Sequence, residues 1–309
     1  MKITVIGTIN KDLILPFGGA PIESFGGIFY DVAVLSSLLA ETDCIQPVAF
    51  VGEDVYETVC TVLEKLPNVS TDGLMVLPQK NHKVILEYHS PHHRHEKSLF
   101  QFPPLEWSHI EPFLDAEMII VNLICGWDLR REAFVQLSRQ ARNHLYLDVH
   151  YLVMGIDNLG RRFPQKPERV EDWLTGARFV QMNEDEFRLL AEGFRNEVEF
   201  YQHYFEEDQI LLITRAARGA EVVYRREGLV GHKHFPAYAV SQVMDATGCG
   251  DAFGAGFVVH YLQTGDFLKA ADFGNLVAAA NTQLRGTNEM HRLQETIETI
   301  RMANLTKHP

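Results

Sequence analysis

Short apolar runs that alternate with helical stretches constrain the fold of this chain most strongly. We expect strands at 3–7, 47–52, 118–123, 145–149, 179–182 and 210–214. We expect helices at 28–40, 55–66, 129–142, 184–192, 251–263, 267–284 and 293–303. Strands that alternate with helices predict an α/β fold whose mainly parallel sheet is covered on both faces.

Two segments break this alternation. Residues 82–89 alternate apolar and polar side chains, and residues 97–102 follow after a charged turn. This pattern predicts a hairpin with one face exposed to water or to a ligand. Residues 220–235, with Glu227-Gly228 near the centre, predict a second hairpin. The sequence contains no internal repeat and no obvious linker. Its 309 residues, 46% of them hydrophobic, can form one large domain, alone or with a small appendage.

The amino-acid composition argues against several classes of binding partner. The net charge of −13 argues against binding to duplex nucleic acid, which needs a basic surface. The four cysteines lack the paired spacing of a zinc site or a disulfide framework. The first residues lack the apolar run of a signal peptide, and no stretch has the length of a membrane span. We therefore expect a cytoplasmic protein without a nucleic-acid or membrane partner.

The run Asp245–Phe257, DATGCGDAFGAGF, holds four glycines and two aspartates. The dinucleotide fingerprint G-x-G-x-x-G fails here, because Phe253 stands where the third glycine should be. The P-loop pattern also fails, because no lysine follows the glycines. Both of these common nucleotide-binding motifs are therefore excluded for this run.

The same run precedes an apolar helix, and helix N-termini carry unpaired amides and a partial positive charge. Glycines let such amides approach an anion closely, and Asp251 would stand beside that anion as a proton acceptor. An anion hole with a neighbouring carboxylate suits phosphoryl transfer to an alcohol. In the alternative interpretation Asp251 only caps the helix, and Gly254 and Gly256 only allow close helix packing. We prefer this packing role for these two glycines.

The run resembles the C-terminal signature D-T-x-G-A-G-D of the ribokinase-like (PfkB) carbohydrate and nucleoside kinases. Matching elements elsewhere extend the resemblance over nearly the whole chain. It implies a three-layer αβα sandwich with a mainly parallel central sheet and a small β-lid. We expect a single domain over residues 1–309. Because the segment after Asp12 is short, we expect a reduced lid formed mainly by about 80–102, with 13–25 as a further contributor.

The resemblance implies roles for the residues of the glycine run. Asp251 corresponds to the base that activates the acceptor hydroxyl. The backbone amides of Gly248, Cys249 and Gly250 would stabilise the transferred phosphoryl group, so at Cys249 the amide and not the sulfur should act. Asp245 corresponds to a position near a monovalent cation.

The resemblance also implies substrate-binding positions near the N-terminus. Asp12, in a G-x-x-x-x-D element, would bind substrate hydroxyls, although an exposed turn residue is the alternative. Gly26, Gly27 and Asp31 match the element G-G-x-x-x-N. Asp31 replaces the usual asparagine, and an ionised aspartate accepts hydrogen bonds but does not donate them. This exchange leaves the identity of the acceptor open.

The positions that the resemblance assigns to the nucleotide are Asn183, Glu186, Thr214, Gly219 and Asn275. Glu186, in an N-x-x-E element, would bind Mg²⁺ through water, with a plain helix start as the alternative. Thr214 and Gly219 belong to a T-x-G-x-x-G element whose middle glycine is Ala216 here. Asn275 would face the adenine.

Several other polar residues are ambiguous. Arg215 and Arg218 are either neighbours of the phosphates or solvated turn residues. The His92–His95 cluster suggests a metal site, but a solvated hairpin tip is the favoured interpretation because no further ligand completes a shell. Asp148 and His150 end a strand at the edge where α/β sheets bind ligands, and their role stays open.

The leading hypothesis is an ATP- and Mg²⁺-dependent kinase that phosphorylates a hydroxymethyl group of a sugar or sugar-like substrate. The first alternative is a nucleoside kinase, since the aromatic Phe29 and Tyr30 would suit a base-bearing acceptor. The second alternative is a non-catalytic relative that binds ligand. The sequence is compatible with a monomer or a homodimer.

Overall fold

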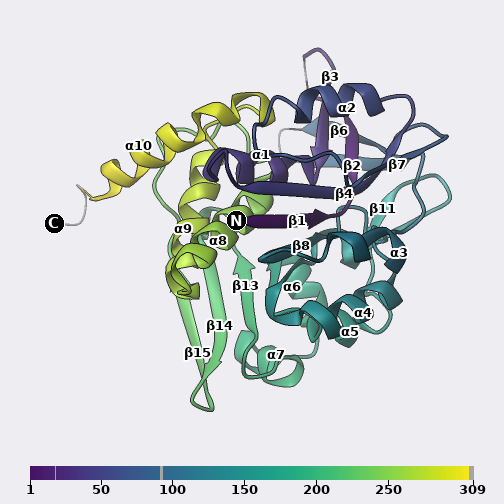
Figure 1. Ribbon diagram of the computed structural model, residues 1–309. Helices are drawn as coiled ribbons and strands as arrows, with labels where there is room; N and C mark the ends of the chain where they lie inside the picture. The colour runs from purple at the N-terminus through teal and green to yellow at the C-terminus, as the bar shows by residue number, and fades with distance from the viewer. Residues whose placement is uncertain (18, 91–92, 306–309) are drawn as a thin grey trace.

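The computed structural model describes residues 1–17, 19–90 and 93–305 (Figure 1). Its large central sheet has the strand order β15-β14-β13-β12-β9-β8-β1-β4-β5. All neighbouring strands from β13 to β5 pair parallel. β14 pairs antiparallel with both β13 and β15. The strands are β1 (Lys2–Ile6), β4 (Cys44–Gly52), β5 (Leu74–Leu77), β8 (Met118–Asn122), β9 (Leu145–Asp148), β12 (Phe179–Asn183), β13 (Ile210–Thr214), β14 (Ala220–Arg226) and β15 (Leu229–Phe235).

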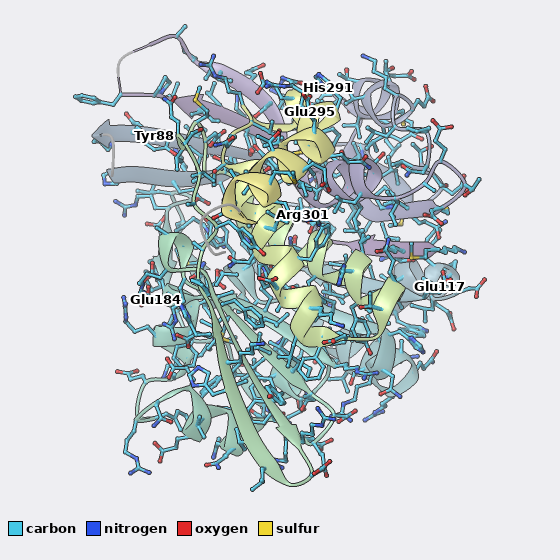
Figure 2. The ribbon with its side chains drawn as sticks, turned by 90° about the vertical axis from the view of Figure 1, so that its left-hand side faces the viewer. Tyr88, Glu117, Glu184, His291, Glu295 and Arg301 are labelled. Carbon is cyan, nitrogen blue, oxygen red and sulfur yellow. The ribbon has the colours of Figure 1, made fainter. Side chains whose placement is uncertain are left out.

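Helices cover both faces of this sheet, which confirms the three-layer sandwich (Figure 1). The first layer consists of α1 (Phe29–Leu38), α2 (Tyr56–Leu63), α8 (Cys249–Thr264), α9 (Phe267–Asn281) and α10 (Leu293–Leu305). The second consists of α3 (Trp107–Ile110), α4 (Arg131–Ala141), α5 (Val170–Leu174), α6 (Glu184–Leu190) and α7 (Glu197–Tyr204). α10 lies outermost, with polar side chains such as Glu295 directed to solvent (Figure 2).

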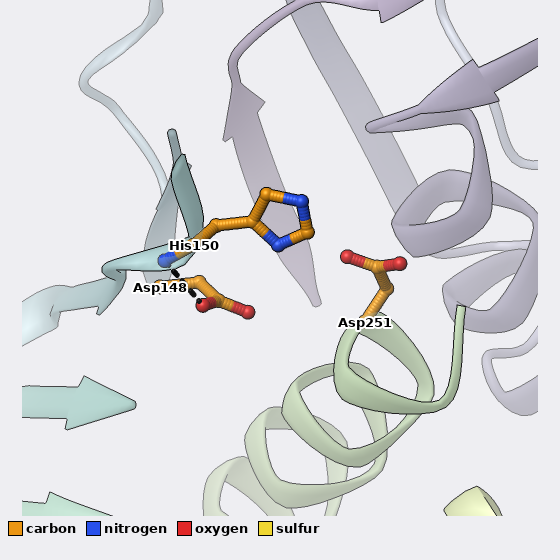
Figure 3. Close-up of side chains that lie close together, drawn as sticks. All are labelled: Asp148, His150 and Asp251. Atoms are coloured by element: carbon orange, nitrogen blue, oxygen red, sulfur yellow. Dashed lines mark hydrogen bonds between the residues drawn. The ribbon is translucent and has the colours of Figure 1, made fainter. Parts of the chain in front are cut away.

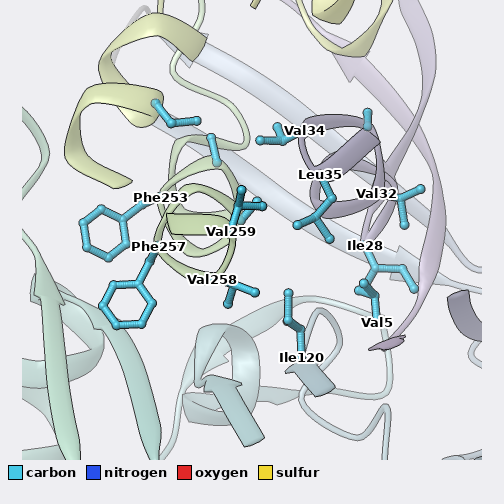
Figure 4. Close-up of a cluster of buried hydrophobic side chains, with 14 of the residues drawn as sticks. Val5, Ile28, Val32, Val34, Leu35, Ile120, Phe253, Phe257, Val258 and Val259 are labelled. Atoms are coloured by element: carbon cyan, nitrogen blue, oxygen red, sulfur yellow. The ribbon is translucent and has the colours of Figure 1, made fainter. Parts of the chain in front are cut away.

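The core consists of two clusters, because alternate residues of each buried strand point to opposite faces. In β8, Met118 and Ile120 join the cluster under α1 and α8, whereas Ile119 and Val121 join the cluster under α4. Figure 4 shows the first cluster, in which Phe257 and its neighbours on α8 pack against α1 and the sheet. Burial on both faces explains why these strands are continuous apolar runs in the sequence.

A second sheet of four strands, here called the lid sheet, has the order β3-β2-β6-β7. Its strands are β2 (Ile9–Leu15), β3 (Ile22–Gly27), β6 (Lys83–Ser90) and β7 (His93–Leu99). The expected hairpin at 82–102 is therefore present. Residues 80–102 supply β6 and β7, and residues 9–27, which include the expected contributor 13–25, supply the other two strands of this sheet. The short segment supplies two strands, because β2 and β3 pair antiparallel and β2 runs parallel to β6.

Two smaller features complete the fold. The second expected hairpin is formed by β14 and β15, and Glu227 and Gly228 in its turn both have positive φ. A short hairpin of β10 (Met154–Ile156) and β11 (Arg162–Pro164) lies beside β7 through a bridge between Lys97 and Arg161. Within the described residues, no helix combines the length and the apolar character needed to cross a membrane.

Candidate active site

The start of α8 lies at the centre of the candidate site. Gly248 precedes the helix with a φ of 73°, which favours glycine, and a Cβ there would overlap the ring of Tyr30. Asp251 lies in the first turn and is only 6% exposed. The N–H of Cys249 donates a long hydrogen bond of 3.4 Å to the carbonyl of Ala246. The glycines thus bring the helix terminus close to α1, with a buried carboxylate beside it.

Asn122, at the carboxyl end of β8, links Asp251 to Asp31. Its Nδ2 donates to Asp251 Oδ1 at 2.8 Å and to Asp31 Oδ2 at 2.9 Å. Burial raises the pKa of Asp31 well above its usual range, and the neighbouring charge of Asp251 raises it further. Burial also raises the pKa of Asp251, while the neighbouring His150 and the hydrogen bond from Asn122 oppose that shift. One neutral amide therefore separates two buried acids.

A second set of polar side chains holds α8 against the sheet. Gln181 Nε2 donates to Asp148 Oδ2 at 2.6 Å and to the carbonyl of Gly250 at 3.0 Å. Tyr146 donates its hydroxyl to Gln181 Oε1 at 2.5 Å. Burial, followed by the charges of Glu186, Asp251 and Asp31, raises the pKa of Asp148 well above its usual range.

His150 places an imidazole beside these acids. Its backbone has a φ of 39°, an uncommon conformation for a residue with a side chain, and its N–H donates to Asp148 Oδ1 at 3.2 Å. The ring points toward Asp251 across the gap from Asp148 (Figure 3). One ligand atom from each of Asp148, His150 and Asp251 lies within 4.8 Å of the other two. The site thus combines two carboxylates and one imidazole.

The expected substrate-binding residues meet on the other side of this group. The carboxylate of Asp12 on β2 lies against Gly26 on β3, so close that a Cβ at Gly26 would overlap it. Gly27 has a φ of 65° and leads into α1, which carries Asp31. The charges of Asp245, Asp12 and Asp251 all add to the burial that raises the pKa of Tyr30. Asp12 of the lid sheet and Asp251 of α8 therefore both lie near Tyr30 on α1.

The expected nucleotide-binding residues lie at the ends of β12 and β13. Asn183 and Thr214 are partners in the parallel register of these strands. Asn183 caps α6, and its backbone N–H donates to Glu186 Oε2 at 2.7 Å in a capping box. Burial raises the pKa of Glu186 to about 8. Gly219 has a φ of 94°, and a Cβ there would overlap the carbonyl of Phe235.

Other expected residues have structural partners. Arg215 is 9% exposed and forms ion pairs with Glu184, Glu197 and Glu221, and Arg218 also pairs with Glu184. These carboxylates occupy the two guanidinium groups that the sequence suggested as phosphate neighbours. Glu184 is labelled in Figure 2.

Three further expected positions also have protein partners. Asn275 Nδ2 donates to the carbonyl of Pro236 at 2.7 Å, which fixes the chain after β15. Asp245 accepts the N–H of Thr247 at 2.9 Å. The thiol of Cys249 lies against α9, 3.6 Å from the carbonyl of Ala278.

The structure describes only part of the His92–His95 cluster. His92 lies outside the described residues. Nε2 of His89 lies 3.1 Å from Nδ1 of His95 across β6 and β7, and both side chains are exposed.

The sequence analysis missed Asn122, Gln181 and Tyr146. A signal for the first two was available, because Asn122 ends the apolar strand β8 and Gln181 is a polar residue in the middle of the buried strand β12. A polar side chain at such a position must find a partner, since burying it unpaired is costly.

Comparison with known proteins identifies the family. The family model for the pfkB family carbohydrate kinases matches residues 48–293. The chain belongs to this family.

Individual relatives match only part of this pfkB-family chain, and at low sequence identity. A nucleoside kinase of Methanocaldococcus jannaschii is 26% identical over 128 residues, which is 41% of this chain and 40% of that protein. A fructokinase of Escherichia coli is 30% identical over 164 residues, which is 52% of this chain and 47% of that protein. The chain therefore spans less than half the length of these curated relatives.

The fold has clear counterparts among solved structures. A pyrophosphate-dependent kinase in the ribokinase family, solved as a sulfate complex, matches with a TM-score of 0.76 at 18% identity. The match covers 94% of this chain and 99% of the other. The expected ribokinase-like fold is thus confirmed for this pfkB-family chain.

Proposed function

We propose that this protein is an ATP-dependent kinase that transfers the γ-phosphate to a hydroxymethyl group of a sugar or sugar-like acceptor. One observation carries the proposal. A buried carboxylate, Asp251, stands in the first turn of α8 beside the glycine-flanked helix terminus. Asn122 joins Asp251 to Asp31 on α1, and Asp12 of the lid sheet lies near Tyr30, as Asp251 does. Family membership supports the same reaction class.

In the proposed reaction Asp251 accepts the proton of the acceptor hydroxyl. Burial raises the pKa of Asp251, and the hydrogen bond from Asn122 opposes this by favouring the ionised form that the step requires. The backbone amides of Gly248, Cys249 and Gly250 would stabilise the charge of the transferred group. Asp12 and Asp31, with the turn at Gly26 and Gly27, would orient the acceptor.

The nucleotide would lie along the ends of β12 and β13, near Asn183, Thr214, Gly219 and Asn275. Glu186 would hold Mg²⁺ through water, because its buried carboxyl group forms no ion pair with a lysine or arginine in the described part of the chain. A cation there would favour the ionised form over the neutral acid that burial favours. Bound there, Mg²⁺ would neutralise phosphate charge.

Other features of the proposal follow the sequence analysis. A monovalent cation would lie near Asp245. The protein would act in the cytoplasm on small molecules, as a monomer or homodimer, without nucleic-acid or membrane partners. The argument for a nucleoside acceptor is weaker, because Phe29 and Tyr30 are only 5% and 6% exposed, and Tyr30 packs against Gly248.

The test is a panel of sugars, polyols and nucleosides assayed with ATP and, because a structural neighbour uses it, with pyrophosphate. We expect ADP release with a sugar-like acceptor. The Asp251→Asn variant should bind nucleotide but lose turnover by about 100-fold or more, since general-base catalysis contributes about that factor. Asp115→Asn, which changes a fully exposed carboxylate, is the matched control. Near-normal turnover of Asp251→Asn would remove Asp251 from the base role.

A further inference from the structure

Two buried acids meet at a single amide in the candidate site. Nδ2 of Asn122 donates to Asp31 Oδ2 at 2.9 Å and to Asp251 Oδ1 at 2.8 Å, so both carboxyl groups lie against one nitrogen atom. Asp31 is 2% exposed, Asp251 is 6% exposed and Asn122 has no exposed surface. Two ionised carboxylates this close together in a buried site repel each other strongly, and a proton on one of them removes the repulsion.

No lysine or arginine balances the charge of this pair. Within the described residues, none lies close enough to Asp31 or Asp251 to form an ion pair. Six other titratable groups interact with one or both acids, and His150 is the one among them that can become positive. The six are Tyr30, Tyr146, Asp148, His150, Glu186 and Cys249.

The surroundings of the two acids differ in a way that decides which one keeps a proton. Burial raises the pKa of Asp31 well above its usual range, and the charge of Asp251 raises it further. Burial also raises the pKa of Asp251, but the neighbouring His150 opposes that shift. A ligand atom of His150 lies within 4.8 Å of a carboxylate oxygen of Asp251. The ionised form is therefore favoured at Asp251 and the neutral form at Asp31.

The amide of Asn122 gives an independent reason for a neutral acid at this place. Its Oδ1 is buried and has no hydrogen-bond partner among the described residues, and a buried carbonyl oxygen without a donor is costly. Nδ2 carries two hydrogen atoms, and an acid bonded to the one on the side of Oδ1 lies beside that oxygen. A neutral carboxylic acid there can donate its O–H to Oδ1, whereas an ionised carboxylate can only accept.

We propose that Asp31 is a neutral carboxylic acid in the folded protein and that Asp251 carries the single negative charge of the pair. Asp31 then offers one donor and one acceptor, as does the asparagine of the G-G-x-x-x-N element that it replaces. It acts as a positioning residue, because it holds the Asn122 amide against Asp251 without placing a second charge beside the base. This positioning role rests on the proposed function, whereas the proton on Asp31 belongs to the folded chain alone.

The net charge of the chain tests whether the pair holds a proton. Capillary electrophoresis at pH 7 compares the mobility of the native wild type with that of two variants. Asp31→Asn should keep the wild-type mobility, because it leaves one negative charge on the pair. Asp115→Asn, which changes a fully exposed carboxylate, should shift the mobility by one charge. An equal shift in Asp31→Asn would overturn the proposal.

Nuclear magnetic resonance of the carboxyl carbons tests which acid holds the proton, because neutral and ionised carboxyl groups have different chemical shifts. The wild type is labelled with ¹³C at its aspartate carboxyl groups and measured at pH 7. The resonance lost in Asp31→Asn should be that of a neutral acid, and the one lost in Asp251→Asn that of a carboxylate. The reverse assignment would overturn the proposal. So would a wild-type spectrum without any neutral carboxyl resonance, a result that depends on no variant.

The dependence of kcat/KM on pH tests the positioning role. If Asp31 is neutral, Asp31→Asn leaves the charge near Asp251 unchanged, so the loss of activity in acid should occur at the same pH as in the wild type, whatever the change in turnover. Removal of an ionised neighbour would instead move this loss to lower pH by about one unit or more, and that result would overturn the proposal.

The electrophoresis and the resonance measurement need no acceptor. A chain in which Asp31 is neutral but which phosphorylates no acceptor would therefore contradict only the proposed function.

Discussion

At the scale of single residues, Ala216 carries a backbone cost that its family motif normally avoids. It stands where the T-x-G-x-x-G element has glycine, and its φ is 49°. The loop after β13 requires this conformation, because the N–H of Gly219 donates to the carbonyl of Ala216 at 3.0 Å and the carbonyl of Gly219 accepts from Arg215 at 2.7 Å. A side chain in the left-handed region costs about 1–2 kcal/mol.

Replacing Ala216 by glycine should therefore stabilise the protein. We expect the free energy of unfolding to rise by about 0.5–1 kcal/mol, the relieved strain less the extra chain entropy of glycine. Urea unfolding of the purified variant measures it. Ala217→Gly is the matched control and should destabilise, because Ala217 has no positive φ to relieve. Equal destabilisation by both substitutions would show that the loop stores no strain at Ala216.

At the scale of elements, two glycines let α8 and α9 pack closely. A Cβ at Gly256 would lie 2.8 Å from Val277 Cγ2, and a Cβ at Gly274 would lie 2.7 Å from the carbonyl oxygen of Phe253. The carbonyl oxygen of Phe253 belongs to the backbone, so it cannot move away as the end of a flexible side chain could. The close contact fixes α8, and with it the position of Asp251 at its N-terminus.

Gly274→Ala should push the two helices apart. Because overpacking a tight core costs about 1–3 kcal/mol, we expect a loss of that size in the free energy of unfolding. Calorimetry would measure it. Gly250→Ala serves as the comparison, because the nearest atom to a Cβ there is 3.7 Å away. If Gly274→Ala were as stable as Gly250→Ala, the helix contact would be looser than described.

The central elements were predictable from sequence, and the connections between them were not. Strands such as β8 and β13 are buried on both faces, so their apolar runs identify them. Residues 13–25 were expected to contribute to the lid, but β2 and β3 were not assigned as strands, because half of their residues are exposed or polar and leave no clear pattern.

The same limit applies to the candidate site. The signature run located Asp251, but the contact of Asn122 with both Asp31 and Asp251 depends on how α1 and α8 pack on β8. No local pattern encodes that packing.

At the scale of the whole molecule, His82 lies where the lid sheet meets the central sandwich. It is 1% exposed, its ring lies beside those of Phe102 and Trp127, and its carbonyl accepts the N–H of Lys11 on β2 at 2.8 Å. Burial, with a smaller contribution from Arg162, lowers the pKa of His82 from 6.5 to about 4. The sequence predicts a single domain, and that the lid sheet and the central sandwich unfold together stays a prediction.

The lowered pKa of His82 should weaken the fold in mild acid. Between pH 6.5 and 4 the unfolded chain binds a proton at His82 that the folded chain does not bind, so the free energy of unfolding falls as the pH falls. The full loss is about 3 kcal/mol, since one pKa unit corresponds to about 1.4 kcal/mol. Denaturant unfolding across this pH range measures it.

His82→Gln should flatten this acid dependence, whatever its effect on stability at neutral pH. His144→Gln, which changes an exposed histidine, should leave the dependence as in the wild type. An unchanged slope in His82→Gln would mean that other groups cause the acid sensitivity.

The place of β1 in the sheet has a consequence for synthesis on the ribosome. β1 is made first, but its partners β8 and β4 are made later, and it lies between them. At roughly 5–20 residues per second, β8 follows several seconds after β1. Until β8 is made, the nascent chain exposes an apolar strand whose edge toward β8 is unpaired, a surface that a chaperone at the exit tunnel would bind.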